Sequence, residues 1–331
     1  MCSRFRRVIT AIASAGCLAA IANEALAQAY PVRPIRLVVP YASGGPSDIL
    51  GRTLSLKLGE ILGEQVLVEN RPGVGSIIGT EVVAKAAPDG YTLLLGDIIA
   101  TFAVNPVLYK SLPYNARKDL SPVGPVATAA LVLLVNASFP ARNVQELIAL
   151  ARSKPGELSF GSAGVGNTTH LGPELLNAKY RLSMVHVPYK GIALAMTDLV
   201  AGRLSLVMAG GPGVSKSLID SGKLRGLAIT GEKRAAGLPD IPTFAEAGAP
   251  LPEMNSGSLW GLLAPAGLPR YLVLKLNDAT AQALAAPDVR TRLGALNIDV
   301  ATSSPEAFAG LINGLRETWT EVLTRANITP E

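Results

Sequence analysis

The sequence predicts an α/β protein of two domains, each built on a mostly parallel sheet flanked by helices. The chain has 331 residues, which is enough for two domains of roughly 150 residues each. Short runs rich in β-branched residues alternate with stretches of helical periodicity. This alternation restarts near the middle of the chain, and two long helical stretches end it. A repeated strand–helix–strand order is typical of parallel strands whose helices cover both faces of a sheet.

The first 27 residues have the pattern of a secretory signal peptide. Arg4, Arg6 and Arg7 form a positive start, and an uncharged apolar stretch follows over residues 8–22. That stretch is too short to span a bilayer. Ala25-Leu26-Ala27 then gives the small-residue cleavage pattern. We expect export with cleavage near Ala27; a membrane anchor and a lipoprotein are the alternatives.

Composition excludes several classes of protein. Hydrophobic residues make up 49% and charged residues 17%, so disorder is excluded as the main state. Both cysteines, Cys2 and Cys17, lie in the expected signal peptide, which excludes a disulfide scaffold or a thiolate zinc site. Cleavage leaves 27 basic against 24 acidic residues, a net charge of +3. Without its first 27 residues, the sequence has no run of basic residues, so it lacks the clustered positive charge that is typical of nucleic-acid binding. We expect no metal and no cofactor.

The elements of the first domain follow from local patterns. Apolar residues Leu50, Leu54, Leu58 and Ile61 recur at helical spacing. In chain order, the elements expected here are a strand over 35–39, a turn over 41–48, a helix, a strand over 65–69, a loop over 73–76, a helical stretch to Ala87 and a strand over 91–95.

The second domain starts the same alternation again. The elements expected here are a strand over 131–136, a helix over 144–153, strands starting near 158 and 184, a helix over 193–200, and strands over 204–209 and 225–229. Two tail helices, over 269–285 and 305–326, suggest that the chain returns to its first domain. We therefore expect domain one to comprise 28–126 with 252–331, and domain two to comprise 127–251.

Small and hydroxyl-bearing residues follow several predicted strands. Ligands of open α/β sheets bind beyond the carboxyl ends of strands. The first such loop contains Ser43, Gly44, Gly45 and Asp48, and a helix follows it at once. Free N–H groups and the helix dipole favour an anion at such a place. The alternative is a plain strand–helix turn capped by Ser47 or Asp48.

A second loop, residues 162–170, has the same character. Its hydroxyl groups and its backbone N–H groups, which small side chains leave accessible, are potential hydrogen-bond donors. A solvated glycine-rich turn would have the same sequence pattern. One such loop in each domain predicts a ligand held in the cleft between the domains. Tyr189, just after a strand, is a further candidate for the cleft, whereas Trp260 is expected mainly to pack in the core.

Motifs of common enzymes and nucleotide-binding proteins are poor matches. Gly73-Val74-Gly75 lacks the acidic residue that completes a dinucleotide fingerprint, and Pro212 removes an N–H from the phosphate-loop-like run 210–217. No nucleophile elbow occurs. The alternative function is an exported hydrolase that uses Ser162 with His170 or His186.

Eight ordered motifs carry a resemblance to a known family. They are the runs 30–40, 44–48, 68–73, 86–94, 161–166, 170–171, 185–191 and 261–267, where 170–171 is His170-Leu171. Over essentially the whole exported chain, the sequence resembles the Bug receptors, which are the periplasmic solute-binding proteins of tripartite tricarboxylate transporters.

The resemblance implies a Venus-flytrap fold that closes on a small organic carboxylate in the periplasm. It implies a monomeric receptor that serves a membrane permease or a sensor. In the family, backbone amides and waters grip a carboxylate. By matching position, the first loop contributes Tyr41, Ser43, Gly44, Gly45 and Asp48, and the second contributes Ser162, Ala163, Gly164, Gly166, Asn167, Thr168 and Thr169.

Two departures from the family pattern concern the choice of ligand. Family members often have an aromatic residue and an acid after the position of Met208, where this chain has Ala209 and Gly210. This change removes a partner for a ligand ammonium and widens the pocket. A small hydroxyl residue is usual after Gly96, where this chain has Asp97. If Asp97 faces the cleft, it repels a second carboxylate. The alternatives are that Asp97 is neutral, faces away from the cleft or meets a cationic group.

Overall fold

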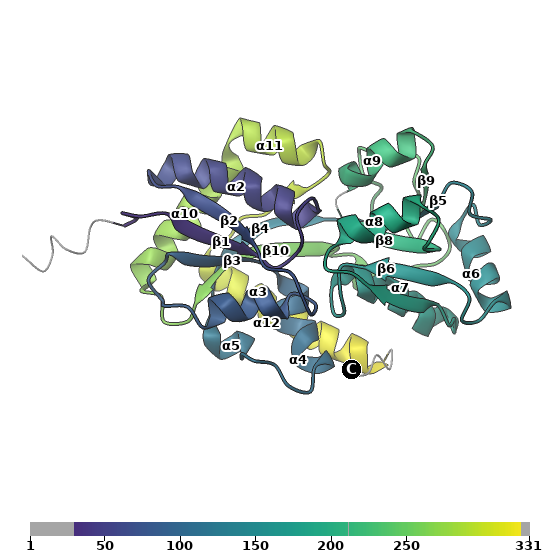
Figure 1. The fold of residues 1–331 in the computed structure, drawn as a ribbon, viewed down its shortest axis with the longest axis horizontal. Helices are drawn as coiled ribbons and strands as arrows, with labels where there is room; N and C mark the ends of the chain where they lie inside the picture. Colours follow the sequence, from purple (N-terminus) through teal and green to yellow (C-terminus); the bar gives the residue numbers. More distant parts are fainter. Residues whose placement is uncertain (1–29, 211, 326–331) are drawn as a thin grey trace, which may run out of the picture.

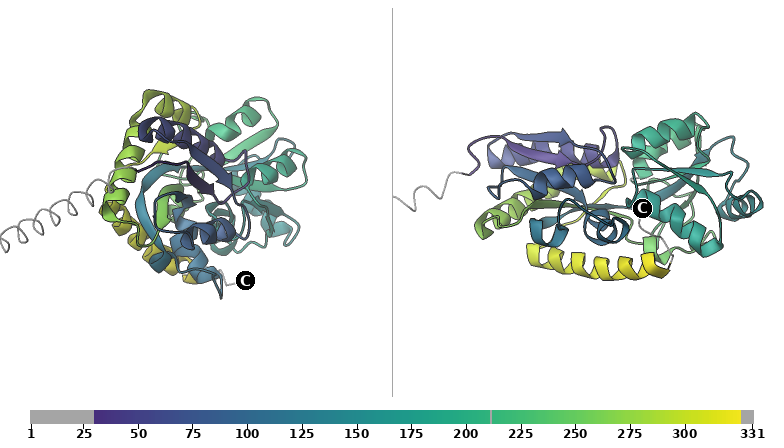
Figure 2. Two further views of the ribbon diagram at one scale, coloured as in Figure 1. Left: turned by 60° about the vertical axis from the view of Figure 1, so that its left-hand side comes forward. Right: turned by 60° about the horizontal axis from the view of Figure 1, so that its bottom comes forward.

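The computed structural model describes residues 30–210 and 212–325, which form two domains side by side (Figure 1). The expected signal peptide, 1–27, lies outside the described residues. Each domain contains one sheet, and helices cover its faces (Figures 1 and 2). No helix within the described ranges combines the length and apolar character needed to cross a membrane.

The sheet of domain one has six strands in the order β11-β4-β10-β3-β1-β2. Their bounds are β1 Ile35–Val39, β2 Val66–Asn70, β3 Thr92–Asp97, β4 Leu120–Ala129, β10 Ser258–Pro265 and β11 Asp299–Val300. The expected strands near 35, 65 and 91 are therefore confirmed with small shifts at their ends. Val38, Leu94 and Leu263 are fully buried on this sheet, as apolar runs covered on both faces require.

The helices of domain one come from both ends of the chain. They are α2 Pro46–Leu62, α3 Ile77–Ala84, η1 Ile99–Val104, α4 Asn105–Leu108, α5 Ala116–Asp119, α10 Arg270–Ala285, α11 Pro287–Gly294 and α12 Pro305–Arg325. Leu50, Leu54 and Leu58 line the buried face of α2 and pack in one core cluster with Leu276 of α10. Leu276 of the tail helix α10 thus packs beside the first long helix of the described chain.

The sheet of domain two has five strands in the order β7-β6-β8-β5-β9. Their bounds are β5 Leu131–Asn136, β6 Ser159–Ser162, β7 Val185–Pro188, β8 Leu206–Gly210 and β9 Leu224–Ile229. The helices around it are α6 Val144–Ser153, α7 Thr168–Tyr180, α8 Ile192–Val200, α9 Pro212–Asp220 and the short η2 Pro252–Met254.

Both sheets are mixed, which corrects the expectation of mostly parallel sheets. In domain one β2-β1-β3 are parallel, but β10 runs antiparallel to β3 and β4, and β11 runs antiparallel to β4. In domain two β7-β6-β8 are parallel, but β5 runs antiparallel to β8 and β9. The chain leaves domain one after β4 and enters domain two with β5; it leaves domain two after β9 and returns with β10. Each of these four strands has an antiparallel partner.

Three stretches of chain join the domains. Ala130 alone separates β4 from β5, and the return leads from β9 to β10. The third is α12, which runs along one side of both domains (Figure 2). Its first half buries Phe308 in domain one, whereas Trp319 in its second half packs in a core cluster that contains residues of both domains. The described parts of the two domains are therefore linked by these three stretches.

Candidate functional site

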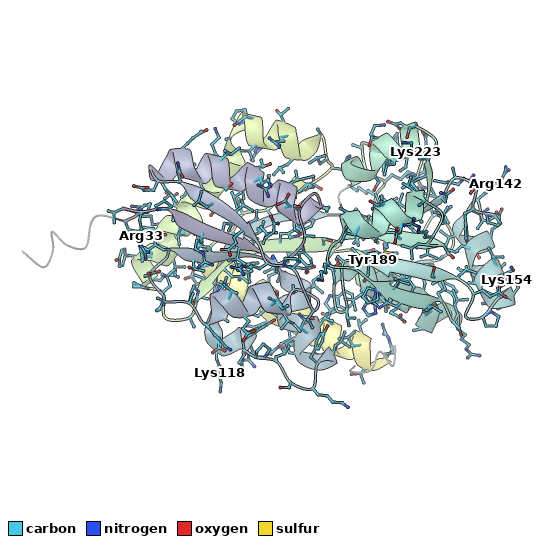
Figure 3. All side chains as sticks on the ribbon, viewed as in Figure 1. Arg33, Lys118, Arg142, Lys154, Tyr189 and Lys223 are labelled. Carbon is cyan, nitrogen blue, oxygen red and sulfur yellow. The ribbon has the colours of Figure 1, made fainter. Side chains whose placement is uncertain are left out.

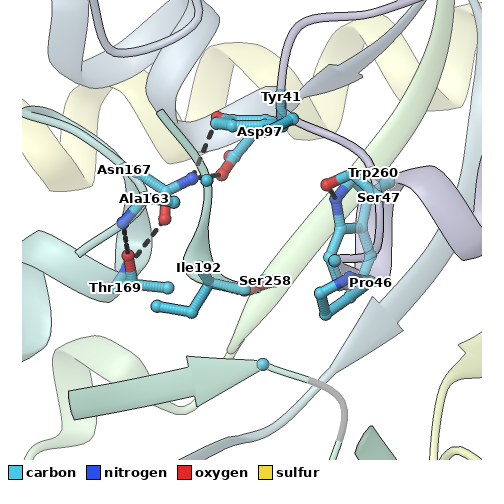
Figure 4. Close-up of a pocket in the computed structure, with 14 residues that line it drawn as sticks. Tyr41, Pro46, Ser47, Asp97, Ala163, Asn167, Thr169, Ile192, Ser258 and Trp260 are labelled. Atoms are coloured by element: carbon cyan, nitrogen blue, oxygen red, sulfur yellow. Dashed lines mark hydrogen bonds between the residues drawn. The ribbon is translucent and has the colours of Figure 1, made fainter. Parts of the chain in front are cut away.

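A small cavity lies where the two domains meet (Figure 4). Its volume of about 30 Å³ is enough for one or two waters but not for an organic acid. The cleft is therefore closed in this structure. The lining residues are Tyr41, Ala42, Gly45, Pro46, Ser47, Asp97, Ala163, Asn167, Thr169, Gly191, Ile192, Gly210, Ser258 and Trp260.

The N-terminus of α2 forms one wall of this cavity. Pro46 stands at the first helical position, where its missing N–H costs nothing, and no side chain caps the helix. The N–H groups of Asp48 and Ile49 donate to the Gly45 carbonyl. Within the described part of the chain, the N–H groups of Gly45 and Ser47 find no acceptor. The positive end of the helix dipole thus opens on the cavity with two free donors.

Asp48 holds the first loop in shape from behind. Its carboxylate accepts the Gly44 N–H at 3.0 Å and the Asn70 side-chain amide at 3.0 Å, and it pairs with Arg52. Burial opposes ionisation here, but the hydrogen bonds from Arg52, Gly44 and Asn70 outweigh it and lower the pKa of Asp48. Asp48 does not line the cavity; it fixes the backbone that does.

Asn167 bridges the two domains on the opposite wall. Its side-chain Nδ2 donates to Asp97 Oδ2 at 2.8 Å and to Tyr41 Oη at 2.9 Å. Both partners belong to domain one, whereas Asn167 caps α7 of domain two. Burial and the nearby Asp97 raise the pKa of the Tyr41 phenol, so the phenol keeps its proton. Figure 4 shows these three side chains converging on one side of the cavity.

Asp97 brings a buried carboxyl group to the cavity. It ends β3, and its Oδ1 accepts the Ala100 N–H at 3.1 Å, where η1 begins. Burial raises its pKa to about 7, although hydrogen bonds from the Ala100 and Ile99 N–H groups act in the opposite direction. None of the residues that line the cavity is basic. The basic side chains labelled in Figure 3 lie at the periphery of the molecule.

The second loop is held in shape by its own side chains. The Ala163 N–H donates to Thr169 Oγ1 at 2.8 Å, and the Gly164 N–H donates to Ser162 Oγ at 3.0 Å. Gly166 donates weakly to His170 Nδ1 at 3.3 Å. These three amides therefore have partners within the loop and are not free donors while the cleft is closed.

Behind this loop lie two adjacent histidines, of which His170 is buried and His186 is half-buried. Ser162 Oγ and His186 Nε2 are 2.6 Å apart, and the rings of His170 and His186 lie 4.1 Å apart between centroids. Burial lowers the pKa of His186 to about 4; burial together with His186 lowers that of His170 to about 3. Ser162 is fully buried and does not line the cavity. The arrangement supports the loop and offers the serine no route to a substrate there.

The predicted site residues divide into two groups. Seven of them line the cavity: Tyr41, Gly45, Asp97, Ala163, Asn167, Thr169 and Gly210. The others are elsewhere: Ser43 is exposed, Gly44 borders a neighbouring chamber, Asp48, Ser162, Gly164, Gly166 and Thr168 are buried without lining the cavity, and the Tyr189 hydroxyl donates to Asp198.

Some lining residues were not predicted from the sequence. Ser258 and Trp260 lie on β10, far along the chain, and Ile192 begins α8. Trp260 was expected mainly in the core; it packs there and also lines the cavity, and its indole Nε1–H donates to Ser47 Oγ at 2.9 Å. Only the pairing of β10 with β3 reveals this neighbourhood. Among the described residues, no cluster of His, Cys, Asp and Glu could hold a metal ion.

The comparisons with known proteins agree with this architecture. Residues 50–328 match the family model described as the tripartite tricarboxylate transporter family receptor. The chain belongs to this receptor family. A protein encoded in the tcbD–tcbE intergenic region of Pseudomonas sp. strain P51 is 39% identical over 318 residues, which are 96% of this chain and 93% of that protein.

Solved structures of other receptors share the fold. The R. palustris protein Rpa4515, solved with adipate, is 34% identical with a TM-score of 0.85; the match covers 92% of this chain and all of that one. The periplasmic binding protein BugD is 33% identical with a TM-score of 0.82, over 91% of this chain and all of BugD. The resemblance to Bug receptors and the two-domain fold are thereby confirmed for this receptor.

Proposed function

We propose that this receptor captures a small organic carboxylate in the cleft between its domains. The observation that carries the proposal is the uncapped start of α2, where the free Gly45 and Ser47 N–H groups meet the interdomain cavity. A carboxylate placed there gains two hydrogen bonds and the favourable end of the helix dipole. The adipate in the related structure of Rpa4515 supports the same class of ligand.

Binding requires the cleft to open and close. We propose domains of 28–126 with 252–331 and of 127–251, which move about the links between β4 and β5 and between β9 and β10. The cavity of about 30 Å³ is too small for an acid to enter without such a motion. Closing brings Asn167 onto Asp97 and Tyr41, and the ligand shifts the balance towards the closed state by its contacts with both domains.

The expected site residues that do not line the cavity have a place in this proposal. Gly44, Gly164 and Gly166 give the two loops their left-handed backbone turns, with φ of 87°, 125° and 80°. Asp48, Ser162 and Thr168 anchor these loops through side-chain hydrogen bonds, and the Tyr189 N–H donates to the Ser162 carbonyl at 3.1 Å. Ser43, which is exposed, belongs to the mouth of the open cleft.

The receptor would act in the periplasm after cleavage near Ala27. As a monomer, it would deliver its ligand to a membrane permease or report it to a sensor. BugD, a periplasmic binding protein, supports the location. Mass spectrometry of the exported protein tests the cleavage: a mature N-terminus near Gln28 is expected, and an uncleaved chain would contradict it.

A thermal-shift screen of the purified protein tests the ligand class. We expect one or more organic acids to raise the melting temperature in proportion to the logarithm of their concentration. Amines, sugars and nucleotides are screened at the same concentrations as control classes of solute. A rise with one of these classes and with no carboxylate would overturn the proposal.

The hydrolase alternative has one observation on its side, the 2.6 Å contact between Ser162 and His186. The burial of Ser162 and its place outside the cavity speak against it. Assays with p-nitrophenyl esters decide between the two functions. We expect no turnover above buffer, whereas turnover that disappears in Ser162→Ala would establish the hydrolase.

A further inference from the structure

A second, larger chamber adjoins the interdomain cavity. Its volume is about 350 Å³, and it lies between the start of α2, the outer turns of α8, the end of β8 and α9. Four residues border both spaces, namely Gly45, Pro46, Ile192 and Gly210. The uncapped start of α2 therefore stands between a small polar cavity and a roomy chamber.

The wall of this chamber is mostly apolar. Met196 and Val200 of α8, Ala209 of β8 and Leu218 of α9 all line it. Ala209 and Gly210 both border the chamber, and neither carries a side chain larger than a methyl group, so the end of β8 leaves this space open.

One polar group in the chamber has no partner. The Ser215 hydroxyl is fully buried, borders the chamber, and makes no hydrogen bond within the described residues. A buried hydroxyl without a partner is destabilising, so such groups are expected to have a ligand or a water beside them. This is an observation separate from the shape of the chamber, and it too indicates an occupant.

The charges of the two spaces disfavour a second carboxylate on the ligand. Neither space is lined by a lysine, arginine or histidine. The one ionisable acid is Asp97, which is 2% exposed and faces the small cavity. A dicarboxylate would have to bury its second charge either beside Asp97 or against apolar side chains, and both positions carry a desolvation cost without a counter-ion.

We propose that the ligand is a monocarboxylate with an apolar chain or ring, whose carboxylate binds at the start of α2 and whose apolar part fills the chamber beside α8. This proposal rests on the receptor function proposed above and narrows its ligand class. It sets this receptor apart from Rpa4515, whose structure contains the dicarboxylate adipate.

Isothermal titration calorimetry with hexanoate and adipate tests the proposal, because the two acids have the same chain length. We expect hexanoate to bind at least tenfold more tightly than adipate. In the series acetate, butyrate, hexanoate, affinity should rise about fourfold per methylene, as burial of about 0.8 kcal/mol per CH₂ implies. A flat series, or adipate the tighter ligand, overturns the proposal while the receptor function stands. If no carboxylate binds, both fail.

Variants locate the apolar part of the ligand. Ala193 borders the chamber on α8, so Ala193→Leu should narrow it and lower the ratio of hexanoate to acetate affinity at least fivefold. The matched control is Ala201→Leu, at the exposed end of the same helix, which should leave all affinities unchanged. Asp97→Asn should shrink the preference for hexanoate over adipate. An unchanged affinity ratio in Ala193→Leu, with the fold intact by circular dichroism, contradicts the placement.

Discussion

The side-chain amide of Asn167 donates a hydrogen bond to the Asp97 carboxylate across the boundary between the domains, with 2.8 Å from Nδ2 to Oδ2. The same amide reaches Tyr41 Oη, and its Oδ1 accepts the Thr169 N–H at the start of α7. One side chain thus caps a helix of domain two and holds the strand end of domain one. Opening the cleft must break the contacts across the boundary but not the cap.

Replacing Asn167 with alanine should destabilise the protein by about 2–4 kcal/mol. The change removes the cap of α7, which contributes about 1 kcal/mol, and leaves the buried Asp97 oxygen without its donor. Urea unfolding measures the loss. Gln282→Ala, which removes a single surface hydrogen bond to Asp278, is the control and should change stability by less than about 0.5 kcal/mol. Equal effects of the two variants would contradict the role given to Asn167.

Closure of the cleft should depend on the absence of a side chain at Gly164. A Cβ at this position would lie 3.2 Å from the Gly75 backbone of the other domain, and its φ of 125° is strained for alanine. Gly202 has a positive φ as well, but a Cβ there meets nothing within 4 Å. We expect both alanine variants to lose stability and Gly164→Ala alone to lose tenfold or more in ligand affinity by calorimetry. An equal loss of affinity in Gly202→Ala would indicate backbone strain and not the contact between domains.

Local sequence patterns predicted the strands and helices whose conformation is determined by their own residues. The strand over 131–136 and the helix over 144–153 have the bounds that the sequence predicts, because β-branched runs and helical periodicity are local properties. β10 was missed, although all eight of its residues are buried. Its partners β3 and β4 lie more than a hundred residues away, so its antiparallel pairing is visible only in three dimensions.

The candidate site could be predicted in outline for the same reason. Strand ends followed by small residues lead to Gly45, Asn167 and Thr169, and the family resemblance adds Tyr41; all four line the cavity. The sequence could not show which amides stay free. That depends on side chains such as Asp48 and Thr169, which satisfy the N–H groups of Gly44 and Ala163.

Stability should rise with pH between about 4 and 6.5. His170 and His186 have pKa values of about 3 and about 4 in the folded protein and near 6.5 when unfolded, so the unfolded state binds more protons in this range. Their contribution is complete above pH 6.5 and is lost as the pH falls towards 4. Asp97, whose pKa is raised to about 7, acts in the opposite direction from pH 4 to 7 but offsets only one of the two protons.

Urea unfolding at pH 4.5 and 6.5 measures this dependence. We expect the difference between the two pH values to shrink in His186→Gln, which keeps a polar group opposite Ser162. In Asp97→Asn the difference should grow, because the opposing group is gone. A stability that falls between pH 4.5 and 6.5 in the unaltered protein would show that the histidine pair is not buried in its neutral form.

Ligand binding should be visible in the fluorescence of Trp260. The chain has two tryptophans, and both are buried. Trp260 lines the cavity and donates to Ser47 Oγ, next to the free amides proposed to hold the carboxylate, whereas Trp319 does not line the cavity and packs in a core cluster shared by the two domains. A bound carboxylate changes the electrostatic field at the first indole and leaves the second unaffected. The titrant is an acid that raises the melting temperature. It should shift the emission of the Trp319→Phe variant as it does that of the unaltered protein. The emission of the Trp260→Phe variant should stay constant. A signal that survives in Trp260→Phe would place the ligand away from the start of α2.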